Sequence, residues 1–266
     1  MQKRQLLQAL AALALAATTT PAAQAQTTRI KVGVTAGPHA QVMEAVKKVA
    51  VRNGLDIQIV EFSDYVQPNA ALAAGDLDAN SYQHKPYLDQ QVADRGYKLV
   101  AVAPTVMPPL AVYSKKVKSL DALKNGARVG IPNDPSNEGR ALLLLQAQGL
   151  IKLNPKAGLK ATPLDVVENP KNIRFVEMDA AQLPRSLEDL DASTVNANYA
   201  LAAGLNPVRD GIAREDAKSS QYINILAVRE QDKNKPWVAA LIRSFHSPEV
   251  KKYVEDEFKG SLIPSW

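Results

Sequence analysis

Apolar and polar positions follow two different periods along this chain, and the two periods alternate. Residues 29–37 form a short apolar stretch that predicts a buried strand, and residues 39–54 carry apolar side chains at helical spacing until Gly54. An alternation of strands with helices is typical of an α/β fold, in which helices flank a mostly parallel sheet. The order continues with predicted strands at 56–62, 77–83, 98–107 and 110–114, and with predicted helices at 67–75 and 85–96.

The pattern begins again in the second half of the chain. Residues 127–134 repeat the first strand and its turn, and a long predicted helix (137–149) and a strand (173–179) follow. The tetrapeptide Asp-Leu-Asp-Ala occurs at residues 76–79 and again at residues 189–192, each time shortly before an Asn and a Tyr. Echoes that recur in the same order indicate two α/β lobes of similar topology.

The predicted lobes are not continuous in sequence. We expect residues 26–112 and 225–266 to form lobe I and residues 113–224 to form lobe II, so that the chain crosses between them twice. Ligands bind beyond the carboxyl ends of parallel strands, and pockets concentrate where domains meet. A polar stretch at one such strand end (75–88) and its counterpart VNANYA (195–200) are therefore predicted to face each other across a ligand-binding cleft.

The first 25 residues have the features of a cleaved secretory signal peptide (1–25). Lys3 and Arg4 precede an apolar run, and Ala23-Gln24-Ala25 matches a small-x-small cleavage site. The sequence contains no cysteine, so neither a disulfide nor a lipid-modified cysteine is expected. We therefore expect a protein that is secreted to the periplasm and is not lipid-anchored.

Composition adds little to this picture. Hydrophobic residues make up 46% of the 266 residues, which is enough to bury a large core. The net charge is +5, but no run of five or more basic residues occurs, so nucleic acid is not an expected partner. No later apolar run reaches the roughly 18 residues that a membrane-spanning helix needs.

Three kinds of chemistry are disfavoured by the motifs. The segment from Asp76 matches the first half of a calcium loop but has Ser81 and Tyr87 where the loop needs Gly and Glu. The three histidines are far apart in sequence, which argues against a zinc site. No nucleophile elbow, Walker loop or dinucleotide fingerprint occurs, so no catalytic residue and no cofactor is predicted. An enzyme that uses a carboxylate pair remains an alternative.

Arg140 comes early in the second long predicted helix, where the helix dipole disfavours a positive charge. A bound carboxylate would explain this placement, because a helix N-terminus and a guanidinium together form an anion receptor. In that case, removal of Arg140 is expected to weaken binding and to leave the stability of the apo protein nearly unchanged. The alternative is an exposed arginine that pairs with Glu138 or Asp134. Ser136 or Asn137 is expected to cap the helix.

Asparagines at the predicted strand ends are further candidates for binding a ligand. An amide offers both a donor and an acceptor, which suits a ligand that carries an ammonium and a carboxylate group. Each asparagine by itself is also a common turn residue. The candidates are Asn80, Asn133, Asn137, Asn196, Asn198 and Asn224, and Tyr65, Tyr82 and His84 would add an apolar wall with polar edges.

Several long stretches of the chain closely resemble one protein family. They are residues 64–102, 131–153, 164–172, 182–187 and 222–230. The family is that of the NlpA/MetQ-type methionine-binding proteins of bacterial ABC importers, and the resemblance extends from Arg29 to Trp266. It implies a two-lobed, type II-like periplasmic binding protein fold. It also implies a substrate-binding component, not an enzyme, that binds L- and also D-methionine between the lobes.

The resemblance implies a role for individual residues. Arg140 is similar to the arginine that binds the ligand carboxylate, and Asn196 and Asn224 are similar to the asparagines that bind the polar backbone of the ligand. The tyrosines and the histidine stand where the family lines the side-chain pocket. The predicted ligand-binding residues are Tyr65, Tyr82, His84, Asn137, Arg140, Asn196, Asn198 and Asn224.

The chain also departs from the pattern of many relatives. It has Met107-Pro108-Pro109 in place of an aromatic residue before a proline, and Ser81-Tyr82 in place of a small residue and a phenylalanine. A methionine-containing dipeptide or another small amino acid is therefore an alternative ligand, and a periplasmic enzyme or a ligand sensor is an alternative function. The partners implied are a membrane permease and, through it, a cytoplasmic ATPase, with this protein itself a monomer.

Overall fold

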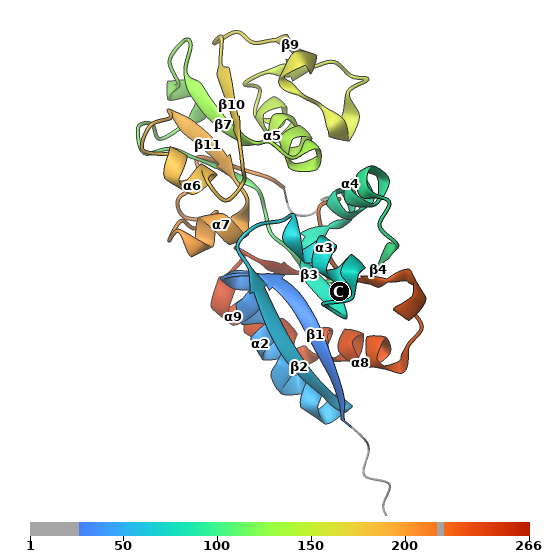
Figure 1. The fold of residues 1–266 in the computed structure, drawn as a ribbon. Coiled ribbons are helices and arrows are strands. Elements are labelled where there is room, and N and C mark those ends of the chain that lie inside the picture. The colour runs from blue at the N-terminus through green and yellow to red at the C-terminus, as the bar shows by residue number, and fades with distance from the viewer. Residues whose placement is uncertain (1–26, 217–220) are drawn as a thin grey trace, which may run out of the picture.

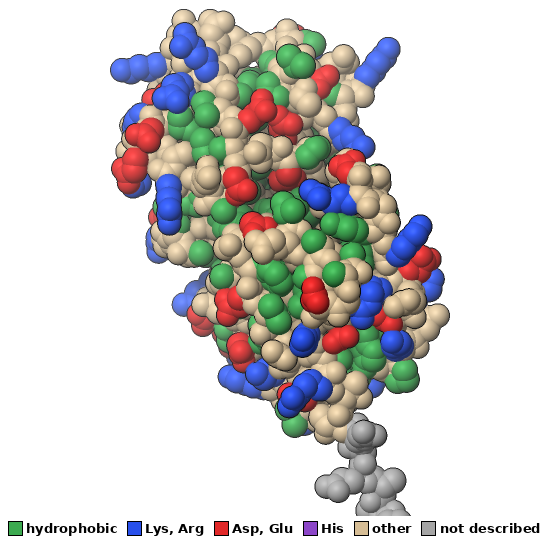
Figure 2. Space-filling model, viewed as in Figure 1, with side chains coloured by type: hydrophobic (Ala, Val, Ile, Leu, Met, Phe, Trp, Pro, Cys, Tyr) green, Lys and Arg blue, Asp and Glu red, His purple; other side chains and the backbone are tan. Residues whose placement is uncertain are grey.

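The computed structural model describes residues 27–216 and 221–266, and the predicted signal peptide lies outside them. The described chain forms two lobes, each built around a five-stranded sheet (Figure 1), which confirms the predicted α/β fold. Positive and negative side chains are interspersed over the face drawn in Figure 2, with no single-sign patch on it. Within the described ranges, every helix is too short or too polar to cross a bilayer.

Lobe I is built on a mixed sheet. Its strands, in spatial order, are β2 (Leu55–Phe62), β1 (Thr28–Thr35), β3 (Ala79–His84), β13 (Asn224–Arg229) and β4 (Leu99–Pro104). The pairs β1–β2 and β1–β3 are parallel, as predicted from the strand–helix alternation. Strand β13 returns from lobe II and runs antiparallel to both β3 and β4.

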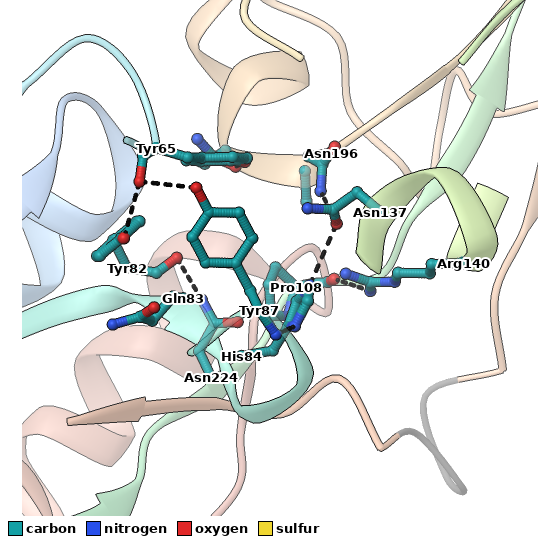
Figure 3. A pocket seen from close by; sticks show the side chains of 12 residues that line it. Tyr65, Tyr82, Gln83, His84, Tyr87, Pro108, Asn137, Arg140, Asn196 and Asn224 are labelled. Atoms are coloured by element: carbon teal, nitrogen blue, oxygen red, sulfur yellow. Dashed lines mark hydrogen bonds between the residues drawn. The ribbon is translucent and has the colours of Figure 1, made fainter. Parts of the chain in front are cut away.

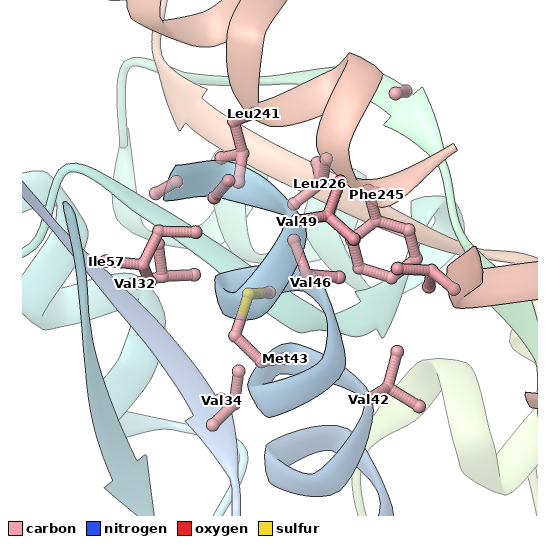
Figure 4. Close-up of a cluster of buried hydrophobic side chains, with 14 of the residues drawn as sticks. Val32, Val34, Val42, Met43, Val46, Val49, Ile57, Leu226, Leu241 and Phe245 are labelled. Atoms are coloured by element: carbon pink, nitrogen blue, oxygen red, sulfur yellow. The ribbon is translucent and has the colours of Figure 1, made fainter. Parts of the chain in front are cut away.

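Helices cover both faces of this sheet, and the alternating side chains of β13 point into the core on each face. Leu226 and Val228 lie in the larger core, against α2, α8 and α9 (Figure 4). Ile225 and Ala227 point to the opposite face, against α3 and α4. The helices are α2 (Pro38–Ala50), α3 (Gln67–Ala74), α4 (Lys85–Arg95), α8 (Pro236–Phe245) and α9 (Pro248–Phe258), with short turns η1 (Val51–Asn53) and η6 (Glu230–Asp232).

Lobe II repeats the arrangement. Its sheet has the order β10 (Arg174–Met178), β7 (Arg128–Pro132), β11 (Ala192–Val195), β6 (Ala111–Tyr113) and β12 (Ala213–Arg214). Strands β10, β7 and β11 are parallel, whereas β6 is antiparallel to its neighbours β11 and β12. The helical elements are α5 (Pro135–Ala147), α6 (Leu183–Ser186), α7 (Ala197–Ala202) and the turn η2 (Leu120–Ala122), and residues 150–171 contain β8 (Lys152–Leu153), η3 (Gly158–Lys160), η4 (Pro163–Asp165) and β9 (Val166–Glu168).

The two Asp-Leu-Asp-Ala segments make equivalent contacts in the two lobes. The Asp78 carboxylate accepts from the backbone N of Lys31 at 2.8 Å, and the Asp191 carboxylate accepts from the backbone N of Arg128, also at 2.8 Å. The leucines of the two segments pack against Gly33 and Gly130, where a Cβ would lie 2.4 Å and 2.9 Å from a leucine Cδ1. The echo therefore holds β1 against β3 in lobe I and β7 against β11 in lobe II.

The chain passes between the lobes twice. The predicted strand 98–107 ends early, because β5 (Val106–Met107) leaves the sheet and pairs with β14 (Ile263–Pro264). Strand β6 already belongs to the second sheet at Ala111, and β13 already belongs to the first at Asn224. These strands lie at the predicted lobe boundaries of 112/113 and 224/225, which stay a prediction because strand pairing alone does not delimit independent units.

Candidate functional site

A pocket with an empty volume of about 320 Å³ lies between the two lobes (Figure 3). This volume includes the open space at the mouth of the pocket. Its lining consists of Tyr65, Tyr82, Gln83, His84, Tyr87, Pro108, Asn137, Arg140, Asn196, Ala197, Asn198 and Asn224. All eight residues predicted to bind ligand are in this set, although their role in binding stays a prediction.

Two of the asparagine candidates lie elsewhere. Asn80 is fully buried in lobe I, where its amide donates to Asn69 Oδ1 at 2.9 Å and accepts from Gln83 Nε2 at 3.0 Å. Asn133 is exposed after β7. Asn80 therefore serves a polar network inside the fold, and the pattern of strand-end asparagines overpredicts the site at these two positions.

Three tyrosines form the apolar wall of the pocket. The Tyr65 ring centroid lies 5.9 Å from that of Tyr82 and 6.0 Å from that of Tyr87. The hydroxyls of Tyr82 and Tyr87 both donate to the Tyr65 carbonyl, at 2.8 Å and 3.0 Å. Burial raises the pKa of Tyr82, so its hydroxyl stays neutral. The polar ends of two of these rings are thus satisfied by the backbone, and aromatic carbon remains to contact a ligand.

His84 and Asn137 join the lobes at one side of the pocket. His84 Nδ1 accepts from the backbone N of Tyr87 at 3.1 Å, so Nε2 carries the proton and donates to Asn137 Oδ1 at 3.2 Å. Burial, and then the nearby positive charge of Arg140, lower the pKa of His84 to about 3, which keeps the ring neutral. Asn196 Nδ2 donates to the same Asn137 oxygen at 2.9 Å.

The orientation of Asn137 is set by the start of α5. Asp134, and neither Ser136 nor Asn137, caps this helix, which corrects the predicted cap. The Asp134 carboxylate accepts from the backbone N of Asn137 at 3.0 Å and from its Nδ2 at 3.0–3.1 Å. Because Asn137 Nδ2 is engaged there, its Oδ1 faces His84 and Asn196.

Two buried amide atoms of lining residues have no hydrogen-bond partner among the described residues. They are Asn196 Oδ1, an acceptor, and Asn198 Nδ2, a donor. A buried polar atom without a partner is unfavourable by about 1–3 kcal/mol. One spare donor and one spare acceptor are what a bound zwitterion could satisfy.

The amide of Asn224 is oriented by His39, a residue to which the sequence assigned no role in the site. Asn224 Nδ2 donates to His39 Nε2 at 3.0 Å and to the Tyr82 carbonyl at 3.1 Å. His39 Nδ1 then carries the ring proton and donates to Thr35 Oγ1 at 2.6 Å. Both Asn224 N–H groups are therefore used within lobe I, and its Oδ1 remains as an acceptor for a ligand.

The neutral His39 ring makes stability depend on pH. Burial lowers the pKa of His39 from 6.5 to about 4. As pH falls below 6.5, the unfolded chain takes up a proton on His39 that the folded protein does not take up. The contribution of the neutral His39 ring to stability is therefore fully present above pH 6.5 and is lost on acidification towards pH 4. At pH 5 the loss that is due to this group is roughly 2 kcal/mol.

Urea unfolding of the wild type and of His39→Gln at pH 7 and pH 5 measures this effect. We expect the stability difference between the two proteins to shrink by roughly 2 kcal/mol at pH 5. Glu138, whose pKa burial raises to about 7, titrates in the same range, but it is shared by both proteins and cancels. A difference that stays constant with pH would show that His39 is not held neutral by burial.

Arg140 is 2% exposed, so the alternative of an exposed arginine is wrong. Its partner is neither Glu138 nor Asp134 but Glu215, which accepts from Nε at 2.9 Å and from Nη2 at 2.6 Å. Nη2 also donates to the Pro108 carbonyl at 2.9 Å (Figure 3). The guanidinium carbon lies 4.4 Å from the Tyr222 ring centroid, a cation–π contact that further fixes its plane.

Hydrogen bonds across the cleft hold the lobes in a closed arrangement. The Tyr65 hydroxyl of lobe I donates to Asn198 Oδ1 of lobe II at 2.6 Å, and the Tyr199 hydroxyl of lobe II donates to the Ser63 carbonyl of lobe I at 3.2 Å. The rings of Tyr65 and Tyr199 lie 4.9 Å apart. Pocket residues themselves thus contribute to closure, and binding and closure share the same side chains.

Sequence reasoning missed four lining residues. Tyr87 was not among the residues predicted to bind ligand, but it lines the pocket. Gln83 and Ala197 each lie next to a predicted site residue, so adjacency was the signal that could have identified them. Pro108 belongs to the segment Met107-Pro108-Pro109, which the sequence marked as a departure from relatives, and its carbonyl contact with Arg140 shows its place in the pocket.

Known proteins resemble this chain over nearly its whole length. The family of NlpA lipoproteins matches residues 30–266. The D-methionine-binding lipoprotein MetQ of Salmonella typhimurium is 52% identical over 240 residues, which cover 89% of this chain and 88% of that protein. A nutrient binding protein from Burkholderia cenocepacia bound to methionine is 56% identical with a TM-score of 0.88, and the match covers 89% of this chain and 100% of that chain. The crystal structure of the methionine binding protein MetQ is 51% identical with a TM-score of 0.87, over 90% of this chain and 98% of that one.

The names of the relatives correct the predicted location. Besides the MetQ lipoproteins, an outer membrane lipoprotein of Mannheimia haemolytica is 47% identical, over 90% of each chain. A lipoprotein is held at a membrane by its lipid, so the expectation of a freely secreted protein without a lipid anchor is wrong. That expectation rested on the absence of cysteine from the sequence.

Proposed function

The chain belongs to the NlpA lipoprotein family, and on this premise we propose that it is the substrate-binding component of an ABC importer for methionine. The observation that carries the proposal is the pocket between the lobes, where an aromatic wall lies beside one buried guanidinium. A thioether gains from contact with aromatic edges, and a carboxylate gains from a charge-assisted hydrogen bond. The 56% identity to a nutrient binding protein bound to methionine supports the same ligand.

Each part of methionine has a proposed partner. The thioether chain lies against Tyr65, Tyr82 and Tyr87, whose hydroxyls are engaged elsewhere. The carboxylate binds Arg140 and the spare Nδ2 of Asn198. The ammonium group donates to amide oxygens, of which Asn224 Oδ1 is the one oriented by His39.

The size of the pocket favours a single amino acid over a dipeptide. Its 320 Å³ includes open space at the mouth, so the enclosed part is smaller still. Neutral amides offer both donors and acceptors, and they can therefore serve either enantiomer of the ligand. We propose that L-methionine and D-methionine both bind, which agrees with the D-methionine in the names of relatives.

The proposed partners follow from this role. A permease in the membrane receives the ligand from the closed protein, and a cytoplasmic ATPase acts through the permease. We propose that the protein itself works as a monomer without enzymatic activity. The lining set contains no serine, cysteine, lysine or carboxylate. Its histidine, His84, has one ring nitrogen engaged by the backbone N of Tyr87 and the other by Asn137 Oδ1, so neither is directed at a bound ligand as a general base.

Ligand binding closes the lobes because the ligand touches both of them. Arg140 and Asn198 belong to lobe II, and Tyr82 and Asn224 belong to lobe I. A ligand shifts the equilibrium towards the closed form only by its preference for that form. Contacts on both walls exist only when the cleft is closed, so they supply that preference.

Native mass spectrometry, calorimetry and small-angle scattering test the proposal together. We expect the purified protein to carry or take up methionine, and its radius of gyration to decrease when L-methionine is added to the ligand-free form. L-glutamate is the control ligand, since the apolar wall offers its second carboxylate no partner. Absence of methionine binding would contradict the proposed function, whereas binding with an unchanged scattering profile would contradict only the closure mechanism.

A further inference from the structure

A carboxylate lies behind the buried guanidinium of the pocket. Glu215 follows β12 and does not line the pocket, yet both of its oxygens accept from Arg140, at 2.9 Å and 2.6 Å. Its Oε2 also accepts from the backbone N of Leu110 at 3.1 Å, and its own backbone N donates to the Leu110 carbonyl at 2.9 Å. Glu215 is therefore fixed to the first crossover segment by its backbone and to α5 through Arg140.

The pair leaves one edge of the guanidinium for a ligand. Nε and Nη2 of Arg140 are directed to Glu215 and to the Pro108 carbonyl. Across the described ranges, no hydrogen bond engages Nη1. A guanidinium has a rigid, planar set of donors, so a bidentate carboxylate on one edge determines where the other donors point. Glu215 thereby determines the direction in which the Nη1 donors of Arg140 point.

The pair of Arg140 and Glu215 also determines the net charge beside a bound ligand. Arg140 is the one charged side chain in the pocket lining, and its side chain is 2% exposed against 15% for that of Glu215. His84 and His39 are neutral. Asp134, an acid close to the pocket, is engaged by the N-terminus of α5 and by Asn137. A cation that already has a bidentate carboxylate partner attracts a second carboxylate less than a bare cation does.

We propose that Glu215 is a positioning residue that makes this pocket select zwitterionic ligands over anionic ones, an inference that rests on the proposed function. With Glu215 in place, a ligand carboxylate approaches a pair of net charge zero. A zwitterion compensates by donating its ammonium protons to neutral amide oxygens such as Asn224 Oδ1. A ligand that lacks the ammonium group meets the repulsion of Glu215 without that compensation.

The test compares ligands that differ in charge but share one shape. L-methionine is the zwitterion, and 4-(methylthio)butanoate is the same skeleton without the ammonium group. The readout is the ratio of their dissociation constants, measured by calorimetry or by competition. In Glu215→Gln, which keeps the size of the side chain and removes its charge, we expect the anion to gain affinity relative to methionine, so that the dissociation constant of the anion divided by that of methionine falls about tenfold or more.

Glu168→Gln is the matched control. Glu168 also belongs to lobe II and is also paired, with Lys152 at 2.7 Å, but its side chain is 63% exposed and is not in the pocket lining. We expect both dissociation constants of this variant to equal those of the wild type. Circular dichroism establishes whether each variant is folded.

The outcomes separate a selective role from a structural one. A folded Glu215→Gln in which both ligands weaken equally, so that the ratio stays within about twofold, would overturn the proposal. If Glu215→Gln does not fold, Glu215→Asp takes its place, since its shorter carboxylate compensates Arg140 less well. The ratio should then fall about threefold, and an unchanged ratio would overturn the proposal. Failure of the wild type to bind methionine would instead refute the proposed function, and this inference with it.

Discussion

Replacing Arg140 by alanine is expected to weaken methionine binding by roughly 30- to 1,000-fold, or about 2–4 kcal/mol. The guanidinium is the only charged group in the lining and is 2% exposed, so its contact with a carboxylate is little screened by water. Isothermal titration calorimetry with L-methionine measures the loss. Arg185→Ala is the control, because this exposed arginine of the same lobe does not line the pocket.

The same variant is also expected to be less stable without ligand. Removal of the guanidinium leaves the Glu215 carboxylate, 15% exposed, without its bidentate partner. An ion pair broken from one side leaves an uncompensated charge, and we expect a loss of about 1–3 kcal/mol in urea unfolding. The sequence predicted nearly unchanged stability, since it did not place an acid beside Arg140. If a folded variant binds methionine with near-wild-type affinity, Arg140 does not bind the ligand carboxylate and serves only to pair with Glu215.

Replacing Gly139 by alanine is expected to destabilise the protein by about 1–3 kcal/mol and to weaken methionine binding. Helix propensity alone predicts the opposite sign, because alanine is favoured over glycine inside a helix by about 1 kcal/mol. A Cβ at this position, however, would lie 2.1 Å from the Leu159 carbonyl oxygen and 2.8 Å from its carbon. Backbone atoms cannot rotate away, so α5 must shift. Asn137 and Arg140, on either side of Gly139, would shift with it.

Gly75→Ala provides the comparison for this prediction. Gly75 ends α3 with a φ of +91°, and nothing lies within 4 Å of an added Cβ. Its substitution is expected to cost roughly 1 kcal/mol through backbone strain and to leave the affinity for methionine unchanged. If Gly139→Ala is as stable as the wild type and binds methionine equally well, then the contact between α5 and η3 does not hold the site in place.

The pattern of apolar positions predicted most of the architecture correctly. Strand period and helix period depend on local geometry, so they can be read without knowing what packs where. The echo of Asp-Leu-Asp-Ala likewise predicted a repeated unit, because the same contacts recur at Lys31 and at Arg128. The antiparallel course of β13 was not predicted, since strand direction in a sheet depends on where the chain re-enters the lobe.

The sequence by itself predicted eight of the twelve residues that line the pocket, because these sit at strand ends and helix starts that the α/β fold brings to one edge of each sheet. Only the tertiary structure decided how these side chains are paired. Arg140 meets Glu215 from 75 residues away, and Asn224 meets His39 from 185 residues away. A hydrogen bond needs its two atoms within about 3 Å and well aligned, and periodicity carries no information about such distant pairs. The fold therefore supplies the orientation of the groups, and this orientation determines which atoms are left for a ligand.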